Sequence, residues 1–164
     1  MLLSISIEEY KKEGDRANSF ENRAGLFVSA IVAIISIYLQ VIPFSKLDLG
    51  FNNESKRIII STTIFVGLLF IALILMVISI TYLARVLISR PYSRVDFSNL
   101  ENIDNNKCDE DIMEYAMVQH YNTILLYNVE INNKKSKLYT KGMIFTVISF
   151  MIMLIATIGL LVIL

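Results

Sequence analysis

Few residues of this chain are of the types that carry catalysis or bind metals. His120 is its one histidine and Cys108 its one cysteine. A single imidazole on a helix is more often a packing residue than a base or a metal ligand, and a lone thiol cannot form an intrachain disulfide. The motifs of zinc proteases, serine hydrolases, P-loop proteins and dinucleotide-binding proteins do not occur. We therefore expect a protein that is not an enzyme and that needs no metal or cofactor.

Basic and amide side chains gather in two segments that precede apolar runs. Arg16 and Arg23 precede the first run, and Asn128, Asn132 and Lys135 precede the last one. If the two segments are helices that pack together, their cationic groups could hold a phosphate while the amides bind the edge of a base. The alternative is that the basic residues contact lipid headgroups and anchor the chain without any ligand.

These side chains must be positioned by membrane helices, because the hydrophobic residues are concentrated in three runs. The chain has 164 residues, 55% of them hydrophobic, with 15 basic and 15 acidic residues. None of the charged residues falls within residues 24–44, 58–84 or 142–164. Each run reaches the roughly 18–20 residues that an apolar helix needs to cross a bilayer. We predict an all-α integral membrane protein with three transmembrane helices, and we exclude a soluble domain.

The segments between these runs are short and polar. We expect residues 1–23 to form an amphipathic helix that begins near Ile7, and residues 45–57 to form an external loop. Residues 85–141 are predicted to be a linker followed by a long helix, because apolar residues recur at helical spacing over residues 109–141 without a helix breaker. The helices of residues 1–23 and 109–141 are expected to pack as an antiparallel cytoplasmic stalk.

The orientation follows from the uneven distribution of basic residues. Four lie in residues 1–23 and eight in residues 85–141, against three in residues 45–57. The positive-inside rule therefore predicts a cytoplasmic N-terminus and an external C-terminus. The equal numbers of acidic and basic residues argue against a protein that binds nucleic acid by neutralising phosphates.

Small and polar residues form a stripe along the first predicted transmembrane helix, at Gly25, Ser29, Ala33 and Gln40. Small side chains let helix backbones approach one another closely in a bilayer. We interpret the stripe as a helix-packing face. Its partner is either the second transmembrane helix or the same stripe of another protomer. Packing against another protomer would make the protein a homo-oligomer, which we expect.

The order of these features resembles the Pycsar transmembrane effectors, a family of bacterial anti-phage proteins similar to SLATT and related small membrane effectors. The resemblance covers most of the chain and rests on these stretches: Asp15-Arg16-Ala17, Glu21 to Gly25, Arg90-Pro91, and Gln119 through Asn128, Asn132, Lys135 and Leu138. It implies a protein of the bacterial inner membrane that a cyclic nucleotide activates on infection. The activated protein would then impair the membrane and cause abortive infection. Since the chain carries no appended recognition domain, a cyclic mononucleotide would bind the stalk itself, or a partner protein would activate it.

Two other classes of function fit the same sequence. The chain could be a structural or regulatory membrane subunit of a larger complex, in which the stalk docks a soluble partner. It could also be a holin-like or toxin-like pore that needs no ligand. Ion-coupled transport is disfavoured, because no charged residue lies inside a predicted span.

Overall fold

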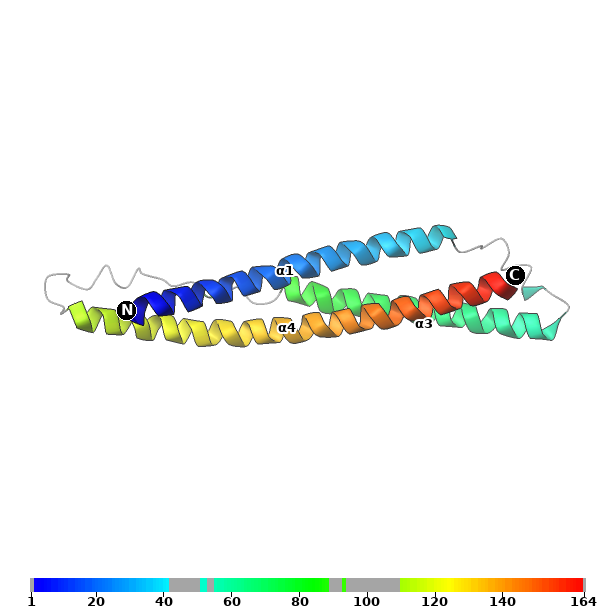
Figure 1. Ribbon diagram of the computed structural model, residues 1–164. Helices are drawn as coiled ribbons and strands as arrows, with labels where there is room; N and C mark the ends of the chain where they lie inside the picture. The colour runs from blue at the N-terminus through cyan, green and yellow to red at the C-terminus, as the bar shows by residue number, and fades with distance from the viewer. Residues whose placement is uncertain (1, 42–50, 53–54, 89–92, 94–109, 164) are drawn as a thin grey trace. The chain divides into compact units, whose positions relative to one another are not determined.

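The computed structural model describes residues 2–41, 51–52, 55–88, 93 and 110–163. Its three long helices are α1 (Leu2–Val41), α3 (Lys56–Ile88) and α4 (Glu110–Ile163) (Figure 1). Each of the three helices contains a stretch long and apolar enough to cross a membrane. The prediction of an all-α membrane protein is therefore confirmed.

The chain divides into two compact units. The polar unit comprises Met1–Arg23 and Ile88–Lys137, and the apolar unit comprises Ala24–Leu87 and Leu138–Leu164. Helices α1 and α4 each continue from the polar unit into the apolar unit as one α-helix.

Within the polar unit, α1 and α4 run parallel to one another. Leu3 contacts Glu114 near the beginning of both helices, and Glu21 contacts Lys135 further along both. The predicted antiparallel stalk is therefore wrong in its direction (Figure 1). The physical reason is that each helix is polar at its N-terminal part and apolar at its C-terminal part. Two such helices must point the same way if their polar parts pack together on one side of a membrane and their apolar parts both enter it.

Within the apolar unit, α3 and α4 pack antiparallel through small polar side chains. The Ser79 hydroxyl donates to the Gly142 carbonyl oxygen at 2.7 Å, and the Ser149 hydroxyl donates to the Ala72 carbonyl oxygen at 2.7 Å. Ser79 also shares a hydrogen bond of 2.6 Å with Thr146. Hydrogen bonds of this kind join helices in a bilayer, where the hydrophobic effect provides little drive for association.

Two glycines of α4 allow α3 to approach closely. A Cβ atom added to Gly142 would lie 2.8 Å from Cγ of Leu83, and one added to Gly159 would lie 2.3 Å from the ring of Phe65. Both distances are far below ordinary van der Waals contact. A side chain at either position would therefore force Leu83 or Phe65 to move from the α3–α4 packing seen here.

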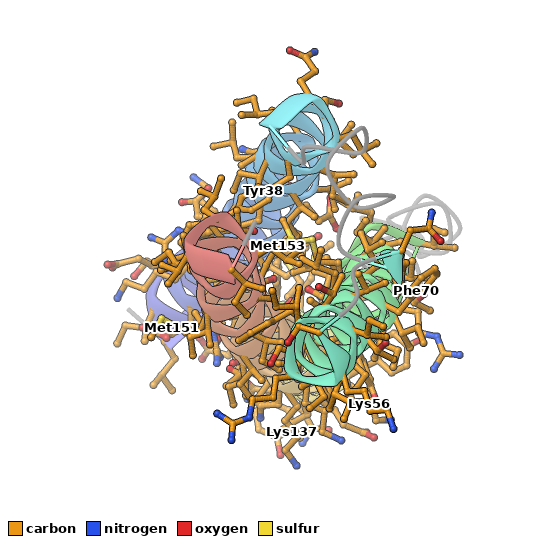
Figure 2. The ribbon with its side chains drawn as sticks, turned by 90° about the vertical axis from the view of Figure 1, so that its right-hand side faces the viewer. Tyr38, Lys56, Phe70, Lys137, Met151 and Met153 are labelled. Atoms are coloured by element: carbon orange, nitrogen blue, oxygen red, sulfur yellow. The ribbon has the colours of Figure 1, made fainter. Side chains whose placement is uncertain are left out.

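The packing of the apolar unit is visible in the side chains of its helices. Met153 of α4 is 2% exposed and points towards the other helices, whereas Met151 and Phe70 point away (Figure 2). The apolar stretch of α1 is the least covered of the three, with 11% of its residues buried against 22% for α3 and 28% for α4.

The observed helix ends differ from the predicted ones. Helix α1 begins at Leu2 and not near Ile7. Ser6 is therefore an interior residue of the helix, and its side chain is buried. Helix α3 extends beyond the predicted run of residues 58–84 by two residues at its start and by four at its end, because charged residues such as Arg57 and Arg85 continue an α-helix as well as apolar ones do. Most of the predicted loop of residues 45–57 lies outside the described residues. The linker that was expected after α3, together with Cys108, also lies outside them, apart from Ser93.

Candidate functional site

Three buried polar side chains share one face of helix α4 within the polar unit. Asn128 and Asn132 are fully buried, and Lys135 is 2% exposed. Their spacing of four and three residues brings them onto one side of an α-helix. Buried polar groups of this kind are expected to have hydrogen-bond partners, because leaving them without one is costly. The partners lie on α1 and at Ser93.

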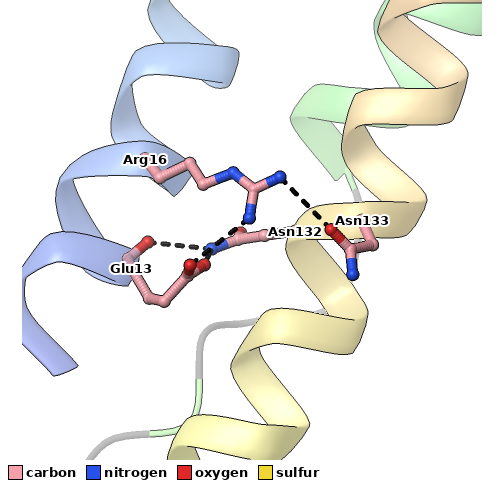
Figure 3. Close-up of polar contacts among 4 residues, drawn as sticks. All are labelled: Glu13, Arg16, Asn132 and Asn133. Atoms are coloured by element: carbon pink, nitrogen blue, oxygen red, sulfur yellow. Dashed lines mark hydrogen bonds and ion pairs between the residues drawn. The ribbon is translucent and has the colours of Figure 1, made fainter. Parts of the chain in front are cut away.

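Asn132 is held by Glu13 of α1 (Figure 3). Its side-chain amide donates to the Glu13 carbonyl oxygen at 2.8 Å and to Oε2 of the Glu13 carboxylate at 2.6 Å. Arg16 donates to the other carboxylate oxygen at 3.3 Å and to the Asn133 side chain at 3.2 Å. The buried Oδ1 atom of Asn132 has no hydrogen-bond partner among the described residues.

Lys135 forms an ion pair with Glu21 of α1. The Lys135 side chain is 2% exposed while that of Glu21 is 40% exposed, so the pair lies at the edge of the interface with the lysine stem inside. The neighbouring pair of Lys134 and Glu130 differs, since both of its side chains are about two-thirds exposed. A buried ammonium depends on its carboxylate far more than an exposed one does.

Asn128 binds the backbone of Ser93. The Ser93 amide donates to Oδ1 of Asn128 at 3.0 Å, and the Asn128 amide donates to the Ser93 carbonyl oxygen at 3.1 Å. The hydroxyl of Tyr10 donates to the same carbonyl oxygen at 3.4 Å. The side-chain amide of Asn128 thus binds both the backbone N–H and the backbone carbonyl oxygen of Ser93, as the backbone of a neighbouring β-strand would.

Four of the five predicted ligand-binding residues come together in this interface. We call the polar layer the set formed by Glu13, Arg16, Glu21, Asn128, Asn132 and Lys135. Arg23 is not part of it and is exposed on α1. His120 is exposed on α4. Among the described residues, no group of three or more histidine, cysteine or acidic side chains could hold a metal ion.

Sequence reasoning missed Glu13 and Glu21. They are four residues either side of Ala17, which is buried, so helical spacing places both carboxylates on the buried face of α1. These acids already engage the groups that a phosphate or a base would need. An anionic ligand that reached Arg16 and Lys135 would have to displace Glu13 and Glu21.

The residues of the predicted packing stripe lie mainly on the surface of the apolar unit. Ser29, Ala33 and Gln40 are exposed and Gly25 is half-buried, with open space where its side chain would be. The hydroxyl of Ser29 donates to the Gly25 carbonyl oxygen within α1. The stripe therefore does not pack on the described part of α3, and the prediction that it meets another protomer stays a prediction.

Comparison of the chain with protein-family models, with curated proteins and with solved structures found no match. The fold and the polar layer define the chain as an all-α membrane protein in which two of three membrane-length helices also build a polar unit.

Proposed function

We propose that this chain is an anti-phage effector of the bacterial inner membrane. A cyclic nucleotide second messenger or a partner activates it, after which it oligomerises and impairs membrane integrity, causing abortive infection. Its N-terminus lies in the cytoplasm and its C-terminus outside, in accord with the distribution of basic residues. The observation that supports the proposal is the buried polar layer between α1 and α4, since both helices continue into the apolar unit.

A buried polar layer suits an interface that must have two arrangements. Buried ion pairs and hydrogen bonds make the packed arrangement specific. They favour it only slightly over the separated arrangement, because the separated groups regain their hydration. Lys135 and the unpartnered Oδ1 of Asn132 would both gain polar contacts if α1 and α4 separated. A ligand that binds the separated arrangement more tightly shifts the population towards it. A shift from 1:99 to 99:1 requires a difference in binding free energy of about 5.5 kcal/mol.

The polar layer contains the chemical groups that a cyclic mononucleotide requires. Arg16 and Lys135 supply cations for its single phosphate, and Asn128 and Asn132 supply amides for the edge of its base. Because Glu13, Glu21 and Ser93 occupy these donors, nucleotide binding is coupled to the separation of the helices. That coupling makes the nucleotide an activator.

The test is a leakage assay with the full-length protein in dye-loaded phospholipid vesicles. Each of the common 3′,5′-cyclic mononucleotides is added in turn, with the linear 5′-mononucleotide as the matched control. We expect release of the dye with at least one cyclic nucleotide and none with its linear counterpart. The proposal fails if no cyclic nucleotide causes leakage and if expression in infected cells leaves the membrane potential intact.

A second candidate function is that of a structural or regulatory subunit of a larger membrane complex. It is favoured by large apolar side chains that are exposed on the polar unit, such as Leu2, Ile112, Tyr115 and Leu126. Exposed apolar residues that lie together, as Leu2 and Tyr115 do along one groove, are typical of a surface that docks another protein. A stable co-purifying protein at fixed stoichiometry, with no leakage under any nucleotide, would favour this function. Leakage without any nucleotide would instead favour a holin-like or toxin-like pore.

A further inference from the structure

The described residues of the apolar unit carry basic groups but no carboxylate. Their charged side chains are those of Lys56, Arg57, Arg85 and Lys141. In the polar unit, by contrast, several cations are paired with acids, as Lys135 is with Glu21. The basic groups of the apolar unit therefore have no acidic side chain of the same unit beside them among the described residues, which leaves them open to an external anion.

Two of these basic residues lie at one end of the antiparallel α3–α4 pair. The ring of Tyr82 on α3 stacks on that of Phe145 on α4, with centroids 5.6 Å apart and planes 3° apart. The ammonium of Lys141 lies 6.0 Å from the centroid of the Tyr82 ring. Arg85 follows Tyr82 by three residues, so it is on the same side of α3. Both Arg85 and Lys141 are exposed.

An apolar groove begins next to Lys141. It has a volume of about 260 Å³ and is lined by Met143, Ile144, Val147 and Ile148 of α4. Ile144 and Ile148 lie three and seven residues after Lys141, which places them on the same face of the helix. A cationic and aromatic end thus borders an apolar surface that runs along the membrane segment.

We propose that Tyr82, Arg85 and Lys141 bind the headgroup phosphate of an anionic phospholipid, whose acyl chain lies along the groove at Ile144 and Ile148. The two cations supply the charge that a phosphodiester requires, and an aromatic ring at this level is typical of the membrane–water interface. The anionic lipid is favoured over a zwitterionic one, because the latter brings its own cation to the site. This inference does not rest on the proposed gating function.

The absence of tryptophan from the chain allows a local test. A single tryptophan is introduced at Met151, an exposed position ten residues after Lys141, and its quenching is compared in vesicles of brominated phosphatidylglycerol and brominated phosphatidylcholine. The matched reporter is Ile64→Trp, an exposed position near the other end of α3. It lies seven residues after Arg57, and α4 contributes no described basic residue at that end. We expect the Met151→Trp reporter to prefer phosphatidylglycerol by about fivefold for each basic residue. The Ile64→Trp reporter, near Lys56 and Arg57, should keep its own lipid preference when Arg85 and Lys141 are substituted.

The charge variants then assign the preference to the site. The double variant Arg85→Gln/Lys141→Gln should lose the preference at the Met151→Trp reporter, and the charge-conserving pair Arg85→Lys/Lys141→Arg should keep most of it. If the neutral double variant does not fold, Lys141→Gln alone should lower the preference about fivefold. The proposal is overturned by equal quenching in the two lipids, or by a preference that the neutral variants leave unchanged.

Discussion

Asn132 of α4 makes two hydrogen bonds to Glu13 of α1, one to its backbone carbonyl oxygen at 2.8 Å and one to its carboxylate at 2.6 Å. The bond to the backbone matters most, because it does not depend on how the Glu13 side chain is oriented. A buried amide that binds the main chain of a neighbouring helix can fix the register of two parallel helices. The pair therefore sets how α1 and α4 align within the polar unit.

The first prediction concerns Asn132 and its neighbour Asn133. Asn132→Ala should destabilise the polar unit by about 1–3 kcal/mol, since it removes two buried hydrogen bonds. Asn133→Ala is the matched control, because Asn133 is exposed and bonds only to Arg16 among the described contacts. It should cost about 0.5 kcal/mol or less. Thermal unfolding in detergent, followed by circular dichroism, measures both, and equal losses for the two variants would contradict the prediction.

The second prediction is an asymmetry within the buried ion pair. Glu21→Gln should destabilise the polar unit by about 2 kcal/mol, because it leaves the buried ammonium of Lys135 without its carboxylate. Lys135→Met should be nearly neutral, since the exposed side of Glu21 regains water. The control is Lys134→Met, which breaks an exposed pair and should change stability by about 0.5 kcal/mol or less. Equal destabilisation by Glu21→Gln and Lys135→Met would refute the asymmetry.

The third prediction concerns the glycines of the α3–α4 interface. Gly142→Ala and Gly159→Ala should each lower stability by about 1–3 kcal/mol, because the new methyl group meets Leu83 or Phe65. Gly67→Ala is the control, since open space surrounds that position, and it should be neutral or stabilising by up to about 1 kcal/mol. The measurement is the temperature at which the detergent-solubilised protein loses its helical signal. A loss at Gly67→Ala as large as at Gly159→Ala would count against this packing.

The fourth prediction tests the hydrogen bond between Ser79 and Thr146. A double-mutant cycle with Ser79→Ala and Thr146→Val should give a coupling free energy of about 0.6 kcal/mol, as is usual for hydrogen bonds between membrane helices. The control cycle pairs Ser79 with Thr81, whose hydroxyl bonds to the Val77 carbonyl oxygen within its own helix. Its coupling should be close to zero. A Ser79–Thr146 coupling that is no larger than the control would show that the two hydroxyls do not act together.

Several features of the fold could be predicted because they depend on local patterns. Charge-free runs indicate the apolar parts of the three helices, and the lack of a helix breaker before Gly142 indicates that α4 continues into its apolar part. The spacing of Asn128, Asn132 and Lys135 places them on one helix face. The direction of packing in the polar unit was also implied by the polar-to-apolar order of α1 and α4, although the prediction was antiparallel.

The partners of the polar residues could not be predicted in the same way. The spacing of Glu13 and Glu21 around Ala17 indicates a shared helix face, but the sequence does not show which groups of α4 the two carboxylates bind. Asn128 binds the backbone atoms of Ser93, and every residue type except proline offers the same two backbone groups, so the sequence does not indicate this partner. The stripe that includes Ala33 is visible in the sequence, but small residues do not specify which helix they meet.

A variant that locks the polar layer tests whether this layer is the switch. Asn132→Leu/Lys135→Met replaces the buried polar groups with apolar ones of similar size, which should hold α1 and α4 together and also remove two of the proposed nucleotide contacts. Dye release from vesicles is measured for this variant and for the wild type with each cyclic mononucleotide. The wild type should leak with an activating nucleotide, and the folded, locked variant should not. Leakage by the locked variant at the wild-type level, or no leakage by the wild type with any nucleotide, would contradict it.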